Sequence, residues 1–189
     1  MSTASQSEIR RRALIARRDL DVEVRSLASR RIATTFLNSH YFYRAARIGC
    51  YISMPDEVAT SDMFARAWLA SKRIYCPVVA SRRRLRFVEV TRESRLERSK
   101  FGLFEPVDGD EILPLELDVV IVPVVAFDGA GHRIGMGGGY YDTTFSALGR
   151  CRNSLHPKLV GVAFNCQKVP KIKANPWDIA LSDVLTEAS

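Results

Sequence analysis

The most apolar stretch of this chain is LDVVIVPVVAFD, residues 117–128. Valine and isoleucine follow one another there, without the polar–apolar alternation of a strand that has one solvated face. A strand of this kind is buried on both faces and is typical of the centre of a parallel sheet. The rest of the chain must therefore supply neighbouring strands and the layers that cover the sheet.

The segments on either side alternate between helical and extended patterns. The spacing of apolar residues predicts helices over 8–19, 22–38, 61–71 and 140–148, and strands over 46–54, 73–79, 85–90, 117–128, 158–164 and within 178–187. Asp21 and Thr60 are expected to cap the second and third helices. Residues 91–116 are predicted to form a polar connection.

The first two helices have contrasting patterns. The helix over 8–19 is basic, and its apolar side is predicted from Ile9, Ala13, Ala16 and Leu20. The helix over 22–38 is predicted to bury Leu27, Ile32, Phe36 and Leu37.

This order of elements predicts the fold class. Strands that alternate with helices favour an α/β fold with a mostly parallel central sheet and right-handed crossovers. We expect a single domain over residues 1–189, with helices on both faces of an open, three-layer structure.

Composition excludes several classes of protein. No apolar run approaches the roughly 18 residues of a membrane span, and the first residues lack a secretory pattern. We expect a cytoplasmic monomer with Cys50, Cys76, Cys151 and Cys166 as reduced thiols. The histidines His40, His132 and His156 are scattered and show no zinc-ligand spacing. The net charge of +7 favours a polyanionic partner without choosing among nucleic acid, nucleotide phosphates and polycarboxylates.

A glycine-rich segment, RIGMGGGYYD, occupies residues 133–142, soon after the apolar strand. Glycines at 135, 137, 138 and 139 can adopt positive φ, and successive N–H groups in such a loop can surround an anion. The expected helix from Tyr140 would point its positive end at the same place. The segment matches neither GxxxxGK[ST] nor GxGxxG. It is interpreted as a phosphate-binding loop, with a tight turn that binds nothing as the alternative.

The charged and aromatic residues of this segment allow two interpretations each. Arg133 could neutralise phosphate oxygens or be a surface arginine. Asp142 could hold Mg²⁺ against phosphates or complement the helix dipole. Tyr140 and Tyr141 could stack on a flat heterocycle, although one of them is expected in the core.

Several segments together resemble the 5-formyltetrahydrofolate cyclo-ligase family. The segment PVVAFDGAGHRIGMGGGYYD (123–142) is similar to the family pattern P-x-x-AFD-x-x-G-x-RLG-x-GGGYYD. Shorter resemblances are YISMPDEVAT (51–60), FGLFEP (101–106), GVAFNCQ (161–167) and the basic IRRRALIARRDL at the start. The resemblance extends over nearly the whole chain.

The resemblance implies an activity and its cofactors. Members of the family use ATP and Mg²⁺ to close 5-formyltetrahydrofolate to 5,10-methenyltetrahydrofolate, with release of ADP and phosphate. Phosphorylation of the formyl oxygen would make the carbon electrophilic and provide a leaving group, and N10 would then attack. No protein nucleophile is needed, because the protein aligns two ligands and stabilises charge.

The resemblance also implies the site residues. ATP contacts are implied for Arg10, Arg133, Ile134, Gly135, Met136, Gly137, Gly138, Gly139, Tyr140 and Tyr141. Folate contacts are implied for Ile52, Met54, Glu57, Met136, Gly137, Gly138, Gly139 and Tyr140. Arg133 and Tyr140 are the implied catalytic residues, and Asp142 and Asp178 are the implied Mg²⁺ ligands. Without the resemblance, the sequence pattern predicts that Glu57 is a surface acid and that Ile52 and Met54 are core residues at the end of a strand.

The chain departs from the family pattern at a few positions. Gln6 stands where the family has a lysine, Val124 replaces a glycine, Thr143 an arginine and Trp177 a histidine. One alternative is therefore a weak or silent relative that binds nucleotide or folate. A second is an RNA-binding protein, based on Arg10, Arg11, Arg12, Arg17 and Arg18 and on Arg82, Arg83, Arg84 and Arg86 near Phe87. Acidic residues interrupt the first cluster, and a charge run is usually a solvated face, which disfavours nucleic acid.

Overall fold

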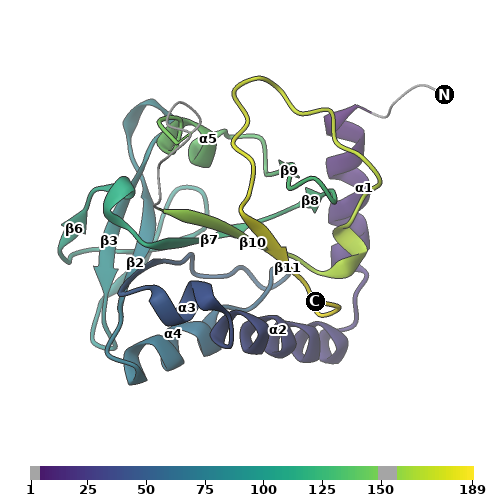
Figure 1. The fold of residues 1–189 in the computed structure, drawn as a ribbon. Coiled ribbons are helices and arrows are strands. Elements are labelled where there is room, and N and C mark those ends of the chain that lie inside the picture. The colour runs from purple at the N-terminus through teal and green to yellow at the C-terminus, as the bar shows by residue number, and fades with distance from the viewer. Residues whose placement is uncertain (1–4, 149–156) are drawn as a thin grey trace.

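A seven-stranded sheet forms the centre of the molecule in this computed structural model, which describes residues 5–148 and 157–189 (Figure 1). The order is β11–β10–β7–β1–β2–β3–β6. The strands are β1 (Arg47–Gly49), β2 (Arg73–Val79), β3 (Leu85–Val90), β6 (Glu111–Ile112), β7 (Val119–Pro123), β10 (Lys158–Val162) and β11 (Asp183–Leu185). Strands β11 to β2 are parallel, whereas β3 and β6 join antiparallel at one edge. The prediction of a mostly parallel α/β sheet is confirmed.

Strand β7 lies between β10 and β1 and is buried on both faces, as its sequence predicts. Val119 and Ile121 face one apolar cluster, and Val120 and Val122 face the other. The strand is shorter than predicted, because it ends at Pro123, whose nitrogen cannot donate to a ladder. Two residues later the chain forms a separate hairpin of β8 (Ala126–Phe127) and β9 (Arg133–Ile134).

Three helices cover one face of the sheet, along the bottom of Figure 1: α2 (Val22–Leu37), α3 (His40–Arg44) and α4 (Ser61–Leu69). Asp21 caps α2 as predicted, by accepting from the N–H groups of Glu23 and Val24. Leu27 was expected in the core but is 51% exposed, because Ala28 and Ile32 take the buried side of the helix. Thr60 precedes α4 but gives no side-chain cap, since its hydroxyl donates to Tyr51 O at 2.8 Å. The short helix α3 was not predicted.

The opposite face is covered by α5 (Tyr140–Thr144), by the turns after it and by the C-terminal segment. The helix was predicted to reach Leu148 but stops after five residues. Beyond it, the Leu148 N–H bonds to Phe145 O, which is the tighter spacing of a turn. Phe145 is fully buried and packs against Phe87, and this contact anchors the turn to the sheet.

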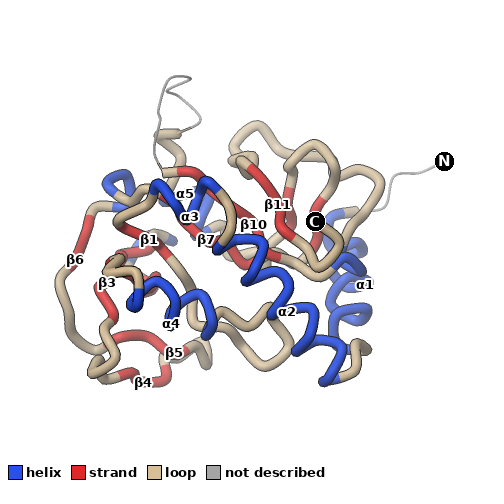
Figure 2. The backbone as a smooth tube through the Cα atoms, turned by 60° about the horizontal axis from the view of Figure 1, so that its bottom comes forward, coloured by secondary structure: helices blue, strands red, loops and turns tan. Residues whose placement is uncertain are grey.

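Helix α1 (Gln6–Arg18) stands beside the sheet rather than on either face of it (Figures 1 and 2). It contacts β8 and the 3₁₀ turn η3 (Asn165–Gln167), and Ala13 is buried there with Ile9 beside it. The predicted basic helix over 8–19 is therefore present, but it begins two residues earlier, at Gln6. Its position next to the β8–β9 hairpin brings it to the glycine loop.

The remaining differences from the sequence predictions are local. The strand predicted over 46–54 pairs only at Arg47–Gly49, and residues 50–54 leave the sheet as a loop. The connection over 91–116 contains a small ladder of β4 (Leu96–Arg98) and β5 (Phe104–Pro106), besides β6. These short strands contain charged residues, so they lack the apolar alternation that predicts a strand.

The cysteine and membrane predictions can be checked over the described residues. Cys50, Cys76 and Cys166 are free thiols, while Cys151 and His156 lie outside the described ranges. Burial raises the pKa of the Cys50 and Cys76 thiols, which keeps them protonated. Within those ranges the helices are too short or too polar to cross a bilayer.

Candidate functional site

The candidate site lies at the edge of the sheet where β1, β7 and β10 end. These three strands are parallel, so the segments that follow them emerge together. The segments are the loop 50–60, the hairpin and glycine loop 124–139, and the stretch 163–178. Helix α1 closes the side of this edge, as its contacts with β8 and η3 show.

The glycine loop runs from the end of β9 to the start of α5 rather than directly from β7. Gly137 and Gly139 have positive φ, of 96° and 68°, which other residues rarely adopt. Gly138 is needed for a different reason, since a Cβ there would lie 2.6 Å from the Tyr140 ring. Because α5 has a single turn, the loop's own N–H groups, and not a long helix dipole, are what this segment offers to an anion.

Arg10 is joined to the glycine loop across 125 positions of the sequence. Its Nε donates to Gly135 O at 2.7 Å. Its guanidinium carbon lies 3.6 Å from the place where a Cβ on Gly137 would stand. The structure therefore brings a cation against the segment that the sequence predicts to bind phosphate.

Arg133 and Asp142 form an ion pair, with 2.7 Å between Nη2 and Oδ1. Arg133 also donates to Ile179 O, and its side chain is 6% exposed, so it is not a surface arginine. The Ile179 N–H donates to the same Asp142 oxygen at 3.1 Å. Asp178 instead turns its carboxylate to its own loop, where Oδ2 accepts from the Asn175 backbone N–H at 2.7 Å.

These carboxylates fit a magnesium ion held mainly by phosphates. All hydrogen bonds that Asp142 accepts from residues 5–148 and 157–189 end on Oδ1, which leaves Oδ2 as a hard oxygen ligand. Over the same residues, no three His, Cys, Asp or Glu side chains converge as a metal site. Mg²⁺ commonly takes one or two carboxylates together with substrate phosphates, and Asp142 with Asp178 nearby could supply them.

The two tyrosines of the loop have different surroundings. The Tyr141 ring stacks on Phe145, with centroids 6.4 Å apart, and burial raises the pKa of its hydroxyl. Tyr140 contacts the ring of Phe101 edge to face, with centroids 6.2 Å apart, and stays partly exposed. Both side chains are partly buried and pack against the same apolar cluster, so burial alone does not single out one tyrosine as the core residue.

The other residues of the loop also differ in exposure. The side chain of Ile134 is buried in the apolar cluster around α1, so only its backbone can contact a ligand. Met136 is 67% exposed on the loop. Trp177 is also largely exposed, one residue before Asp178.

Glu57 lies in a turn after β1 and is mostly buried, with 14% of its side chain exposed. Its Oε2 accepts from the Met54 N–H at 3.0 Å, while the Glu57 N–H donates to Met54 O. Burial raises the pKa of the Glu57 carboxyl, although the Met54 N–H and Arg17 oppose that rise. The surface-acid interpretation of Glu57 is wrong. Ile52, two positions before Met54, is half-buried against the core.

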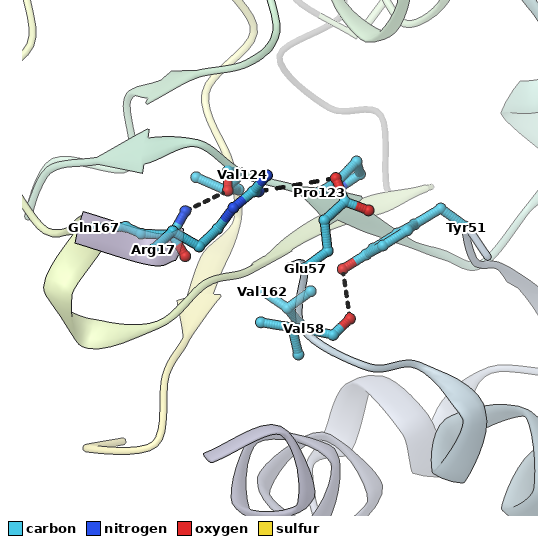
Figure 3. Close-up of a pocket in the computed structure, with 8 residues that line it drawn as sticks. All are labelled: Arg17, Tyr51, Glu57, Val58, Pro123, Val124, Val162 and Gln167. Carbon is cyan, nitrogen blue, oxygen red and sulfur yellow. Dashed lines mark hydrogen bonds and ion pairs between the residues drawn. The ribbon is translucent and has the colours of Figure 1, made fainter. Parts of the chain in front are cut away.

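Three residues of this region were not identified from the sequence: Arg17, Tyr51 and Gln167. Together with Glu57 they line a small pocket, too tight to hold a water molecule, at the ends of β1, β7 and β10 (Figure 3). Arg17 lies 2.8 Å from Asp56 Oδ2 and 3.9 Å from Glu57 Oε1. Its position four residues after Ala13, on the apolar side of the first helix, is the signal that could have revealed it.

The arginines of α1 do not form a continuous basic face. Arg11 and Arg12 pair with Glu8, Arg10 binds the glycine loop, and Arg17 is buried. In the second cluster Arg86 pairs with Glu111. This distribution disfavours a broad nucleic-acid surface on α1, because its arginines already form ion pairs or hydrogen bonds within the protein.

Comparison with known proteins gives a consistent result. A family model described as the 5-formyltetrahydrofolate cyclo-ligase family matches residues 2–187. The chain is 33% identical to a 5-formyltetrahydrofolate cyclo-ligase of Haemophilus influenzae, covering 98% of this chain and 99% of that protein. It is 36% identical to the enzyme of that name from Escherichia coli, over 90% and 93% of the two chains.

Solved structures resemble the fold as well. The NMR structure of Aquifex aeolicus 5,10-methenyltetrahydrofolate synthetase matches with a TM-score of 0.82 and 28% identity, over 97% of this chain and 90% of that one. The fold is also similar to that of a 5,10-methenyltetrahydrofolate synthetase from Mycoplasma pneumoniae, with a TM-score of 0.77 and 22% identity, over 97% and 99% of the two chains.

Proposed function

The chain belongs to the 5-formyltetrahydrofolate cyclo-ligase family, and we propose that it closes 5-formyltetrahydrofolate to 5,10-methenyltetrahydrofolate at the expense of ATP, which becomes ADP and phosphate. One observation carries the proposal: a glycine loop flanked by Arg10 and Arg133 and a mostly buried carboxylate, Glu57, lie at the same edge of the sheet. Helix α1 contacts both groups, since its Arg10 donates to Gly135 O and its Arg17 lies 3.9 Å from Glu57 Oε1. Such a site has one end for phosphates and another for a polar ring.

The reaction requires ATP and 5-formyltetrahydrofolate to be bound side by side, with the γ-phosphoryl group close to the formyl oxygen. A formamide carbonyl is a weak electrophile, and its oxygen is a poor leaving group. Transfer of the γ-phosphoryl group to the formyl oxygen corrects both deficits, and attack by N10 then expels phosphate as the five-membered ring closes. The protein contributes alignment and charge stabilisation, which together account for much of the catalysis in phosphoryl transfer.

We assign the phosphate end to the glycine loop with Arg10 and Arg133. The N–H groups of residues 135–139 are the donors for phosphate oxygens, and Arg10 adds charge from outside the loop. Arg133 is already held by Asp142 and Ile179 O, so its guanidinium is fixed before a nucleotide arrives. Bound Mg²⁺ would neutralise phosphate charge, and Asp142 Oδ2, with Asp178 nearby, would hold it.

We assign the folate end to Glu57, with Ile52 and Met54 beside it and Tyr140 across the loop. A carboxylate can accept two hydrogen bonds from adjacent N–H groups of a pterin in one plane. Glu57 is mostly buried, so water competes little for that pairing. Met136 and Tyr140 lie exposed or partly exposed on the glycine loop and would contact the folate from the phosphate side.

The proposal is tested by direct assay. Purified protein is mixed with 5-formyltetrahydrofolate and MgATP, and the near-ultraviolet absorbance of methenyltetrahydrofolate is followed. We expect a rise that requires ATP and is lost in Asp142→Ala. A flat trace from folded wild-type protein would overturn the proposal, and nucleotide and folate binding would then be measured separately.

A further inference from the structure

Arg17 is a buried arginine whose presence in the core of the site has no packing explanation. The residue is 4% exposed, although it belongs to a helix whose other arginines lie at least partly in solvent. Its Nη2 lies 2.8 Å from Asp56 Oδ2, and its Nη1 lies 3.9 Å from Glu57 Oε1. Its Nε is buried and makes no hydrogen bond to any group in residues 5–148 and 157–189.

A buried guanidinium of this kind contributes little to stability. Removing a charge from water costs about as much as its ion pairs return, and an apolar side chain of similar size often serves as well. An Nε without a partner increases that cost. The position of Arg17 is therefore better explained by what it does to the two carboxylates of the 54–57 turn.

Arg17 is the cation that faces Glu57 within the described part of the chain. The titratable groups around the Glu57 carboxyl come from three elements: Arg17 on α1, Asp56 and Tyr51 in the loop after β1, and Tyr141 on α5. The other three groups are an acid and two phenols, so none of them offers positive charge. Figure 3 shows Arg17 and Glu57 approaching the same pocket from opposite sides.

We propose that Arg17 is a positioning residue for folate recognition, which fixes Glu57 in the orientation and negative charge that accept the N–H groups of the pterin ring. This inference rests on the proposed function for the identity of the ligand. It adds a residue of α1 to the folate end, whereas Arg10, about two turns earlier on the same face of the helix, serves the phosphate end. One helix thus supplies a separate arginine to each ligand.

The charge state of Glu57 gives the proposal a pH signature. Burial raises the pKa of the Glu57 carboxyl, and Arg17 works against that rise. Without Arg17 the pKa rises further, so Glu57 takes up a proton at higher pH. Binding that needs the carboxylate is then lost earlier on acidification.

Arg18 is a natural control for Arg17. It is the next residue on the same helix, it lies 3.6 Å from Asp56 Oδ2, and its side chain is 67% exposed. Its ion pair with Asp56 is solvated, and no ion pair joins it to Glu57 among the described residues. Arg18→Met removes the same charge from the same helix without touching Glu57.

The experiment compares Arg17→Met, Arg17→Lys and Arg18→Met, together with Glu57→Gln and the Arg17→Met/Glu57→Gln double variant. We expect Arg17→Met to lower kcat/KM for 5-formyltetrahydrofolate by about 10- to 100-fold, because a displaced or protonated Glu57 would lose a charge-assisted hydrogen bond to the pterin. The KM for ATP should stay within about twofold, and Arg17→Lys should recover part of the loss because it keeps the charge. In the double variant the two losses should not add, because Arg17 acts through Glu57.

The pH profile and a direct titration separate the possible outcomes. The acid limb of kcat/KM for the folate should move to higher pH in Arg17→Met and stay in place in Arg18→Met. Equal losses in the two arginine variants, or additive losses in the double variant, would overturn the proposal. If the wild type shows no turnover, the proposed function fails, and ¹³C NMR titration of the Glu57 carboxyl still decides the role of Arg17. An unchanged pKa of Glu57 in folded Arg17→Met would overturn it, whereas Arg17→Lys, which keeps the charge, should move the pKa less.

Discussion

The two ends of the candidate site are built in opposite ways. At the folate end, Arg17, Asp56 and Glu57 form a mostly buried cluster whose charges are paired before any ligand arrives. At the phosphate end, the loop is bare glycine backbone beside the exposed Met136 and the partly exposed Tyr140. A planar ring is recognised by a few groups in fixed positions, so preorganisation matters there. A triphosphate is highly charged and can be held by many N–H groups and cations.

This difference predicts how substitutions at each end would impair ligand binding. A substitution in the buried cluster leaves an uncompensated charge, and its effect comes through desolvation and protonation. A substitution in the glycine loop changes backbone conformation or local charge, and its effect depends on geometry and salt. The phosphate end also has one fixed ion pair, Arg133–Asp142, which is buried on the arginine side and partly exposed on the aspartate side.

The largest effect is expected at the phosphate end, in Asp142→Asn. The amide keeps an oxygen that can accept from Arg133 and the Ile179 N–H, so the fold should be retained. It removes the negative charge that a metal ion would need, and we expect kcat to fall about 100- to 1,000-fold, as when one transition-state stabiliser is lost. Steady-state rates at saturating substrates, with magnesium varied, measure the loss. A kcat close to that of the wild type would show that Asp142 serves structure alone.

A substitution of Asp128 should destabilise the hairpin next to the phosphate end. This buried carboxylate accepts from the N–H groups of Ala130, His132 and Ile172 and contacts His132 Nδ1, which ties the β8–β9 turn to the C-terminal segment. Asp128→Asn points an amide at one of these donors and should lower the free energy of unfolding by about 2–4 kcal/mol. The exposed Asp108→Asn is the matched control.

The same carboxylate predicts a pH dependence of stability. Burial alone would raise the pKa of Asp128, but the hydrogen bonds from Ile172, His132 and Ala130 outweigh it and hold the pKa below its ordinary value. The stabilisation is therefore complete above the unfolded pKa of about 4 and is lost as the pH falls toward the folded value. Urea unfolding should show a gap between wild type and Asp128→Asn that is wide near neutral pH and narrows in acid. A constant gap would contradict this assignment.

A smaller effect should follow from Gly137→Ala in the exposed loop. Gly137 has a φ of 96°, so alanine there is strained by about 1–2 kcal/mol, and the loop must shift. We expect kcat/KM for ATP to fall about tenfold, which matches that energy, and binding of 5-formyltetrahydrofolate to weaken less, because Glu57 at the other end is unchanged. Gly129→Ala is the control, because its φ is not positive and a Cβ there meets no atom within 4 Å. Equal losses for both ligands would show that the two ends are not separable.

The same contrast explains what the sequence could reveal. The central strand, the parallel sheet and the glycine loop follow from local patterns, and the structure has all three. The burial of Arg17 and Glu57 does not follow from a local pattern. It depends on the contact between α1 and the 54–57 turn, which are about forty residues apart in the sequence. For the same reason the sequence leaves both interpretations of Arg133 open, and its contacts with Asp142 and Ile179 O exclude the surface arginine. Leu27 was predicted to be buried because it fits the apolar spacing, but α2 turns Ala28 toward the sheet instead.

The smallest effect is expected at the outer rim of the phosphate end, in Gln6→Lys. Gln6 is four residues before Arg10 on the same helix and donates to Lys173 O at 2.9 Å. A lysine at this position would add a cation on the side of α1 that faces the glycine loop, and the KM for ATP should fall about two- to fivefold, the range of a solvated ion pair. Because the contact is exposed, the gain should shrink as ionic strength rises. Gln6→Met removes the hydrogen bond without adding charge, so a gain shared by both variants would mean that the bond to Lys173 O restrains the site. No change in either variant would mean that the triphosphate binds beyond the reach of position 6, with the cationic contact limited to Arg10 and Arg133.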